Sequence, residues 1–389
     1  MRIIIFIFKK LLQLVYYIRR ISPPKGGVLI ISRQADTPSI DIRLLEEALR
    51  HLDPGLRIQV MCRYSKSAAE FSLSYLLYLM GPILRAFADA DVVVLDGYCI
   101  PASVLRHRKE LKIIQMWHAM GAFKKFGLAL LGDKEGQDPQ LARMMCMHKN
   151  YDVVFASSRY CVPYFARAFG YPEDKLAVMP LPRVDFIKKK AMVEDTRVRI
   201  LSRRPELYAD GIKALYAPTF RKDADNEGMM RKLAQAAQRA GITLIIRPHP
   251  ILNIGDDIDG AFVENEFESI ELLSVCDVVI SDYSAFILEA ALSDKPIYRY
   301  LPDADSYESG RGFFTDMTNE WPGSASDDAD ELCSLILKGD CDMDGVRAFA
   351  DKYVEYNGEC AKNIAGFVLS MLDHGRKDKE KKQNTGNNS

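Results

Sequence analysis

Two spacings of apolar residues alternate along most of this chain, and together they predict an α/β fold. Short apolar runs bounded by Gly, Pro or Ser are typical of strands buried on both faces of a sheet. Between them lie longer segments in which apolar residues recur every three or four positions, as in helices that cover a sheet. We expect strands at 28–32, 57–62, 92–96, 113–118, 153–157 and 176–179, and again at 214–218, 243–247, 277–281 and 296–300. We expect helices at 41–51, 68–88, 139–149, 160–169, 227–240, 269–275, 285–292, 330–337 and 345–372.

Strands that alternate with helices favour parallel sheets covered on both faces, and the length of the chain favours two of them. At 389 residues the chain exceeds the roughly 250–300 residues at which one hydrophobic core stops growing. Prolines and a charged helical stretch separate the two series of elements, so we expect an N-terminal Rossmann-like domain at 23–190 and a C-terminal one at 191–373. Two doubly wound domains with the site in the cleft between them describe the GT-B architecture. The basic tail 374–389 is expected to be disordered.

The first 22 residues differ from the rest of the chain, because two apolar runs are interrupted by Lys9 and Lys10 and closed by Arg19 and Arg20. A helix that spans a membrane needs about 20 mainly apolar residues, and lysines near its middle count against one. No small-residue cleavage site of a signal peptide follows. We expect an amphipathic helix that lies on a membrane, with its basic residues against anionic headgroups. The alternative is a helix packed on the protein's own surface.

Charge and cysteine content narrow the classes of function. A net charge of -1 argues against a general nucleic-acid binder. The eight cysteines form no C-x-x-C pair and several lie in apolar runs, which indicates buried, reduced thiols of a cytosolic protein. No D-x-D pair follows a predicted strand as a metal-dependent nucleotide-sugar transferase would require, so we expect neither a tightly bound metal nor another cofactor.

Three of the predicted strands end in groups that bind phosphate. One ends in Trp117 and His118, a second in an Arg-Pro-His-Pro sequence around His249, and a third in the turn 281–284, Ser-Asp-Tyr-Ser. Ligands of open α/β sheets collect beyond the carboxyl ends of strands, so we expect both histidines and the turn to face one crevice. The plain alternative for a histidine in this position is a hydrogen bond to a backbone carbonyl in the core.

These motifs carry a resemblance to a known family. Six pieces in order, within residues 112–325, make the chain similar to the CDP-glycerol glycerophosphotransferase family of teichoic acid synthesis. The pieces are 117–127 (WHAMGAFKKFG), 216–221 (YAPTFR), 247–250 (RPHP), 281–284 (SDYS), 295–297 (KPI) and 311–314 (RGFF). The resemblance implies a GT-B transferase at the cytoplasmic face of the plasma membrane. It would move glycerol phosphate, or a related polyol phosphate, from CDP-glycerol or CDP-ribitol to a lipid-linked or polymeric cell-surface glycan.

The resemblance also implies roles for single residues. His118 matches the histidine proposed as general base, and His249 matches one that lies near the diphosphate. Arginine forks suit phosphate oxygens, and three arginines fall within the motifs. The predicted substrate-binding residues are Trp117, Lys124, Arg221, Arg247, Ser281, Asp282, Ser284 and Arg311. For Arg311, the preferred cation for the diphosphate, the alternative is a salt bridge to Asp303, Asp305 or Glu308. Ser284 is also expected to cap the helix that follows, whose amino end favours a diphosphate.

The chain departs from the family pattern at two places. Ala119-Met120 replaces the usual Gly-Thr after the first histidine, and Ala285 replaces a second serine. Both changes remove a hydroxyl that could contact a substrate. Two other functions stay open from the residues: a GT-B glycosyltransferase or epimerase that acts on a UDP-sugar, and a membrane-associated scaffold without activity.

Overall fold

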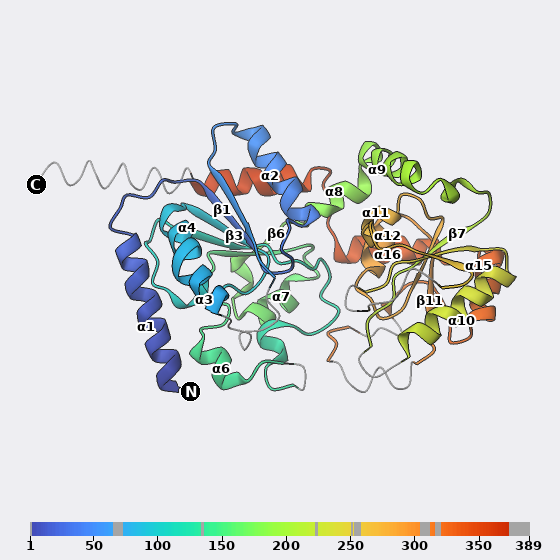
Figure 1. Cartoon of the computed structure of the whole chain (residues 1–389), viewed down its shortest axis with the longest axis horizontal. Helices are drawn as coiled ribbons and strands as arrows, with labels where there is room; N and C mark the ends of the chain where they lie inside the picture. Colours follow the sequence, from blue (N-terminus) through green and yellow to red (C-terminus); the bar gives the residue numbers. More distant parts are fainter. Residues whose placement is uncertain are drawn as a thin grey trace, which may run out of the picture. The chain divides into compact units, whose positions relative to one another are not determined.

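A computed structural model describes residues 2–64, 73–133, 136–221, 225–249, 252, 258–303, 312–315 and 320–372. These residues form two parallel six-stranded sheets with helices on their faces, each within its own compact unit (Figure 1). The predicted fold class, two doubly wound α/β sheets, is confirmed.

The division of the chain differs in detail from the domain boundaries expected from sequence. Among the described residues, unit 1 contains those up to Met120, Lys125–Arg183 and Glu355–Leu372, and unit 2 contains those of Gly121–Lys124 and Val184–Val354. The tail 374–389, expected to be disordered, lies outside the described residues. Residues Gly121–Lys124 belong to unit 2 because Phe123 packs there. Its ring lies 4.7 Å from the ring of Tyr353. The last helix, 360–372, belongs to unit 1, where the rings of Phe367 and Phe155 are 5.5 Å apart.

Unit 1 contains a sheet with strand order β2-β1-β3-β4-β5-β6, all parallel. The order reverses between β1 and β3, which makes their carboxyl ends a topological switch point. The strands are β1 (Val28–Ser32), β2 (Ile58–Cys62), β3 (Val92–Leu95), β4 (Lys112–Gln115), β5 (Val153–Ala156) and β6 (Leu176–Val178). The helices are α1 (Arg2–Arg19), α2 (Ile40–Leu52), α3 (Leu73–Tyr78), the π-helical turn η1 (Leu79–Ile83), α4 (Leu84–Asp89), α5 (Ile100–Val104), α6 (Pro139–Met144) and α7 (Val162–Phe169).

Unit 2 contains a sheet with strand order β12-β11-β10-β7-β8-β9, also parallel. Its order reverses between β7 and β10. The strands are β7 (Lys213–Tyr216), β8 (Thr243–Ile246), β9 (Ala261–Val263), β10 (Val278–Ser281), β11 (Ile297–Tyr300) and β12 (Ser324–Ser326). The helices are α8 (Arg183–Lys188, whose first residue belongs to unit 1), α9 (Lys190–Arg203), α10 (Asn226–Arg239), α11 (Ser269–Leu272), α12 (Ile287–Leu292), α15 (Ala329–Lys338) and α16 (Met343–Tyr353).

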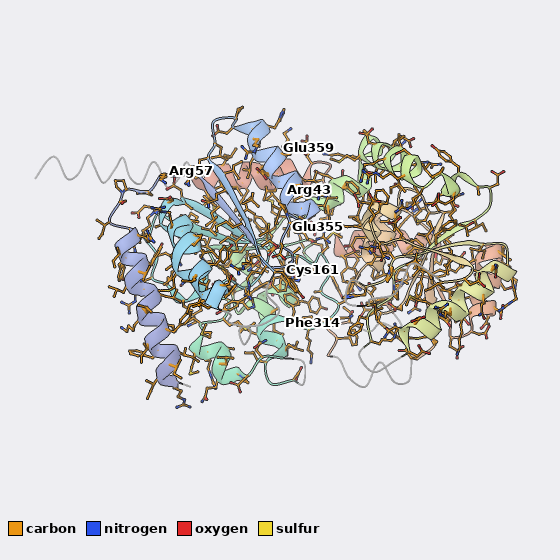
Figure 2. The ribbon with its side chains drawn as sticks, in the orientation of Figure 1. Arg43, Arg57, Cys161, Phe314, Glu355 and Glu359 are labelled. Carbon is orange, nitrogen blue, oxygen red and sulfur yellow. The ribbon has the colours of Figure 1, made fainter. Side chains whose placement is uncertain are left out.

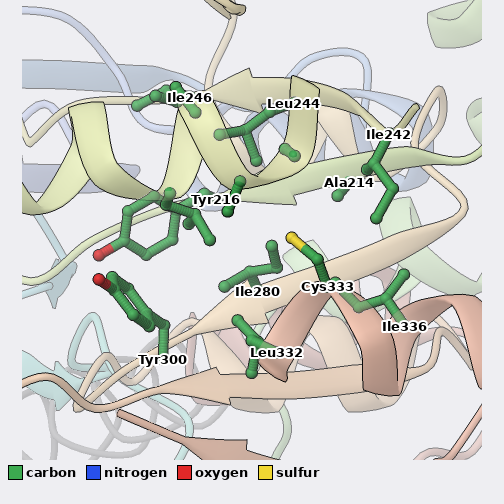
Figure 3. Close-up of a cluster of buried hydrophobic side chains, with 14 of the residues drawn as sticks. Ala214, Tyr216, Ile242, Leu244, Ile246, Ile280, Tyr300, Leu332, Cys333 and Ile336 are labelled. Atoms are coloured by element: carbon green, nitrogen blue, oxygen red, sulfur yellow. The ribbon is translucent and has the colours of Figure 1, made fainter. Parts of the chain in front are cut away.

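The core of unit 2 explains why its strands read as continuous apolar runs. Tyr216, Ile280 and Tyr300, from β7, β10 and β11, face Leu332 and its neighbours on α15 (Figure 3). The two tyrosine rings meet edge to face at 6.2 Å. The inner strands β7, β8 and β10 are buried at three or four successive positions, so apolar residues occupy successive positions instead of alternate ones.

Two predicted helices are broken in the structure. The helix expected at 68–88 is interrupted by the π-helical turn η1, where Pro82 has no N–H to donate. The helix expected at 345–372 ends at Tyr353, and Gly358, with φ of +93°, precedes a second helix. The first helix ends because the backbone of Val354 is extended, and the left-handed Gly358 lies in the loop that separates the two helices.

Helix α1 is docked on unit 1 by one of its faces. Leu12 and Tyr16 are fully buried. The Tyr16 hydroxyl lies 3.1 Å from Nδ1 of His107, and Lys9 Nζ donates to the Met144 carbonyl at 2.7 Å. The opposite face leaves large apolar side chains exposed, namely Ile3, Ile4, Phe6, Ile7, Leu11, Leu14, Tyr17 and Ile18. Among the described helices, none combines the length and apolar character needed to cross a membrane.

Candidate functional site

Trp117 introduces a left-handed turn directly after β4. Its φ is +64°, which is costly for a bulky residue, about 1–3 kcal/mol, unless the surroundings hold it. Here the side chain of buried Gln115 does so, because its Oε1 accepts from Trp117 N at 3.1 Å and its Nε2 donates to the Gly97 carbonyl at 3.0 Å. The indole ring stacks on Phe126 at 5.1 Å. This turn reverses the chain at the carboxyl edge of the sheet and aims the next residue back toward β3.

His118 is held by a backbone carbonyl in a way that fixes its protonation. Nδ1 lies 2.7 Å from the carbonyl oxygen of Asp96, which can only accept, so Nδ1 carries the hydrogen. The neutral ring therefore presents the lone pair of Nε2 as a base. Burial lowers the pKa of His118 below its usual 6.5, which keeps the ring neutral near pH 7. The plain alternative for His118, a hydrogen bond to a carbonyl, is thus present and is compatible with a catalytic role.

Three charged residues near His118 were not identified from the sequence. Asp96 directly follows β3 at the switch point and is buried, and burial raises the pKa of its carboxyl to about 6. Asp41 is buried and accepts hydrogen bonds at 2.8 Å from both the backbone N and Nε of Arg183. Arg183 also donates to the His118 carbonyl at 3.3 Å. Of the three, Asp96 could have been identified from the sequence, because its carboxylate directly follows the apolar run 92–95.

In unit 2, the switch point is occupied by a buried network around Asp282. This carboxylate is 1% exposed and accepts from Thr219 N at 2.8 Å, Thr219 Oγ1 at 2.7 Å and Arg221 Nη1 at 2.9 Å. Arg221 is also buried and pairs through Nε with Asp303 at 2.5 Å. The network ties the loop after β7 to the loop after β10.

This network changes how Arg221 is interpreted. Its guanidinium lies against two carboxylates, and these neighbours raise the pKa of Arg221 despite the opposing effect of burial. Such a cation orders the loops that line a site more readily than it binds a phosphate directly. Asp303, considered from sequence as a partner of Arg311, pairs with Arg221. Arg311 lies outside the described residues.

The turn 281–284 does not begin the following helix in the way expected from the sequence. Helix α12 begins at Ile287, and its N-cap position is Phe286, so the prediction of Ser284 as the N-cap is wrong. Ser284 Oγ instead accepts from Phe286 N at 3.3 Å, within the irregular turns that precede the helix. The side-chain oxygen of Ser281 is fully buried and has no hydrogen-bond partner among the described residues. These turns connect β10 to α12.

His249 and Arg247 follow β8 in the same unit. Arg247 N donates to the Tyr216 carbonyl at 2.9 Å, and Arg247 Nη1 donates to the Glu264 carbonyl at 3.2 Å. The half-buried ring of His249 lies 5.9 Å from that of Phe220, and burial lowers its pKa. A neutral histidine and an arginine therefore lie at the carboxyl edge of β8, next to the network of Asp282.

The predicted site residues fall into two sets. Trp117 and His118 belong to unit 1, whereas the other described ones, Lys124, Arg221, Arg247, His249, Ser281, Asp282 and Ser284, belong to unit 2. Lys124 forms a backbone bridge with Phe313 there. Apart from Lys124, each of these residues lies at or just beyond the carboxyl end of a strand of its own sheet. That the two sets face one crevice stays a prediction.

The described residues contain no group of three or more His, Cys, Asp or Glu side chains placed to hold a metal ion. All eight cysteines are free thiols, five of them buried, as their apolar settings suggested.

Comparisons with known proteins agree with the motifs. The family model for CDP-glycerol:poly(glycerophosphate) glycerophosphotransferase matches residues 14–370. The chain is 30% identical over 360 residues to the teichoic acid ribitol-phosphate primase of Bacillus spizizenii, covering 90% of this chain and 92% of the relative. It is 24% identical over 373 residues to the teichoic acid glycerol-phosphate primase of Bacillus subtilis, with 92% and 95% covered.

A solved structure shares the fold. The wall teichoic acid polymerase TagF matches with a TM-score of 0.75 and 18% identity over 95% of each chain. At this identity the likeness concerns the fold alone, and it fits two doubly wound units. The family model and the primase relative extend over nearly the whole chain. The protein therefore belongs to the CDP-glycerol:poly(glycerophosphate) glycerophosphotransferase family of enzymes.

Proposed function

We propose that this protein transfers a polyol phosphate from a CDP-polyol to a hydroxyl of a lipid-linked glycan acceptor, as a primase of teichoic acid-type synthesis. The observation that carries the proposal is the fixed tautomer of His118, whose Nδ1 donates to the Asp96 carbonyl and whose Nε2 is left as a base. Membership of the family supplies the reaction class. Two relatives matched over more than nine-tenths of their length are primases, one for ribitol phosphate and one for glycerol phosphate.

In this mechanism Nε2 of His118 accepts the proton of the acceptor hydroxyl as its oxygen attacks the β-phosphorus. A bond forms between that oxygen and phosphorus, and the bond from phosphorus to the bridging oxygen of the diphosphate breaks. CMP leaves with the electron pair. His249 and Arg247 are the groups of unit 2 proposed to steady the diphosphate, and the pairs formed by Arg221 hold the surrounding loops.

The donor is the first property to test. Purified protein is incubated with CDP-glycerol, CDP-ribitol or a UDP-sugar, each with a defined lipid-linked acceptor, and the products are read by mass spectrometry. We expect an acceptor that is heavier by one or a few polyol phosphates, together with CMP. Turnover of the UDP-sugar alone would favour the glycosyltransferase or epimerase alternative. Binding of CDP without any transfer would favour the scaffold.

The pH dependence tests the role of His118. Because burial lowers its pKa below 6.5, the rate is expected to hold from pH 8 down to 6.5 and to fall only at lower pH. Asp96, with a pKa of about 6, titrates in the same region, so the profile is compared with that of Asp96→Asn. The fall in rate at low pH that persists in Asp96→Asn is assigned to protonation of His118. A half-maximal rate at or above pH 6.5 would contradict the assignment.

We also propose that the protein lies on the cytoplasmic face of the plasma membrane through α1. One face of this helix is buried in unit 1, and the other exposes a row of isoleucine, leucine and phenylalanine side chains with Lys10 among them. A monomeric protein rarely exposes so continuous an apolar face to water. Insertion of this face into a leaflet would bring the enzyme to a lipid-linked acceptor.

Substitutions on α1 test this attachment. Ile4→Glu and Ile7→Glu are each expected to weaken binding to lipid vesicles at least about tenfold, since burial of an isoleucine contributes roughly 1.5–3 kcal/mol. Both side chains are exposed, so the fold should be unaffected. Leu52→Glu, at an exposed leucine that ends α2, is the matched control. Unchanged sedimentation of Ile4→Glu and Ile7→Glu with vesicles would contradict the proposal.

A further inference from the structure

A basic hollow of about 440 Å³ lies beside α1 in unit 1. It is lined by four cationic side chains and one carboxylate, with a glutamine, a glycine and a proline between them. These residues are Arg19, Lys25, Arg57, Arg85, Asp89, Gln59, Gly81 and Pro82. Arg19 comes from α1, Lys25 from the segment after it, and Arg85 from α4. Arg57, labelled in Figure 2, directly precedes β2. Elements that are distant in the sequence thus contribute one cation each.

The hollow is separate from the candidate active site. Lys25 precedes β1, Arg57 precedes β2 and Asp89 precedes β3, so all three lie at the amino edge of the sheet. His118 follows β4 and therefore lies at the opposite, carboxyl edge. A ligand in the hollow takes no part in the transfer step.

The charges of the hollow are not balanced. Asp89 lies 3.4 Å from Lys25 and 3.8 Å from Arg57, both within ion-pair distance. Arg19 and Arg85 form no ion pair or side-chain hydrogen bond within the described part of the chain. Four cations and one carboxylate leave three positive charges around the hollow, and guanidinium groups suit phosphate oxygens.

The π-helical turn η1 opens this space. Its wide turn brings Gly81 and Pro82 to the wall, and Gly81 contributes no side chain. A Cβ placed on Gly81 would meet no atom within 4 Å, so the hollow extends to the backbone at this point. A side chain introduced at Gly81 would therefore begin in open space at the wall of the hollow.

The exposed apolar residues next to Arg19 in sequence favour a lipid phosphate as the ligand. Ile18 and Ile21, which flank Arg19 in sequence, are 56% and 81% exposed. They continue the exposed apolar face of α1. Anionic phosphates of a bilayer lie at the boundary between its apolar interior and water, which is where cations next to an inserted helix would be. Binding of a phosphate from solution would not require exposed apolar residues beside the site.

We propose that the hollow binds the phosphate of an anionic phospholipid headgroup in the leaflet on which α1 lies. This inference rests on the proposed attachment through α1. Arg19 and Arg85 contact the phosphate oxygens, and Lys25 and Arg57 add charge from the sheet edge. The site would select anionic membranes, whereas the apolar face of α1 by itself does not distinguish lipids by charge.

The test uses the full chain and vesicles of phosphatidylcholine, with or without about one third phosphatidylglycerol. The wild type is expected to bind the anionic vesicles at least tenfold more tightly. Gly81→Glu places a carboxylate in the hollow and should remove most of this preference. Gly81→Gln, which has the same size without the charge, should keep it. Both substitutions favour helix over glycine, so neither should unfold the protein.

Three outcomes would overturn the inference. One is equal binding of the two kinds of vesicle by the wild type, and another is the same preference in Gly81→Glu as in Gly81→Gln. The third is calorimetric binding of inorganic phosphate, lost in Gly81→Glu, without any preference between vesicles, which would assign the hollow to a soluble anion. Polyol-phosphate transfer to a soluble acceptor is measured in parallel. Normal transfer by all variants would leave the transferase proposal intact whichever result the vesicles give.

Discussion

Replacement of His118 by alanine is expected to lower the rate of polyol-phosphate transfer by about 10²–10⁴, the usual contribution of a general base. The substitution removes Nε2, the only atom of this side chain that can accept the acceptor's proton once Nδ1 donates to the Asp96 carbonyl. His118 is half-buried at the edge of the sheet, so the far-ultraviolet circular dichroism should not change. The measurement is kcat with saturating CDP-polyol.

Two further variants test whether the loss of activity comes from the missing base. His118→Asn keeps a donor near the position of Nδ1 but has no base, so it should be as slow as alanine. His51→Ala, at an exposed histidine in the last turn of α2, should keep full activity. A loss of less than about tenfold in His118→Ala would remove this residue from the role of base.

The second large effect is expected at Arg221. Arg221→Ala should destabilise unit 2 by about 3–5 kcal/mol, because it removes the guanidinium that pairs with Asp282 and Asp303, the first of them fully buried. The midpoint of thermal unfolding should then fall by roughly 10 °C. Activity should fall with it, since the loops after β7 and β10 lose their common anchor.

Arg231→Ala is the matched control for this experiment. Arg231 forms an ion pair with Glu227 on α10 of the same unit, but both side chains are about half exposed. Such a pair contributes about 0.3–0.5 kcal/mol, so the unfolding midpoint should hardly move. Equal, small shifts in both variants would show that the network of Asp282 adds little to stability.

The strands show how far the sequence determines the fold. Ten of the twelve strands correspond to apolar runs, because a strand covered by helices on both faces must be apolar at successive positions. The two that escaped, β9 and β12, are edge strands of three residues. β9 is a run of only three apolar residues, and β12 contains two serines, so neither shows the longer apolar run of a buried strand. Their places were decided by the neighbouring strands that pair with them.

The breaks within helices were harder to predict. The apolar spacing continues through Leu79–Ile83 and past Tyr353, yet the first is a π-helical turn and the second ends a helix. Pro82 and Gly358 were visible in the sequence. Their consequences depend on packing, because the segment after Val354 returns to unit 1, where Glu355 N donates to the Ser157 carbonyl.

By itself, the sequence determined which groups reach the edges of the sheets. An apolar run followed by a histidine or by Ser-Asp predicts a polar side chain at the carboxyl end of a buried strand, since the run fixes where the strand stops. This placed His118, His249 and Asp282. It also gave the family, because the order of six short motifs is a property of the chain alone.

Only the tertiary structure decided the state of those groups. His118 is a base through Nε2 because a carbonyl 22 residues away in sequence accepts its other nitrogen. Arg221 holds loops because two carboxylates, 61 and 82 residues away, reach the same guanidinium. Protonation and pairing depend on which atoms lie within about 3 Å, and that proximity arises only when the strands are assembled side by side.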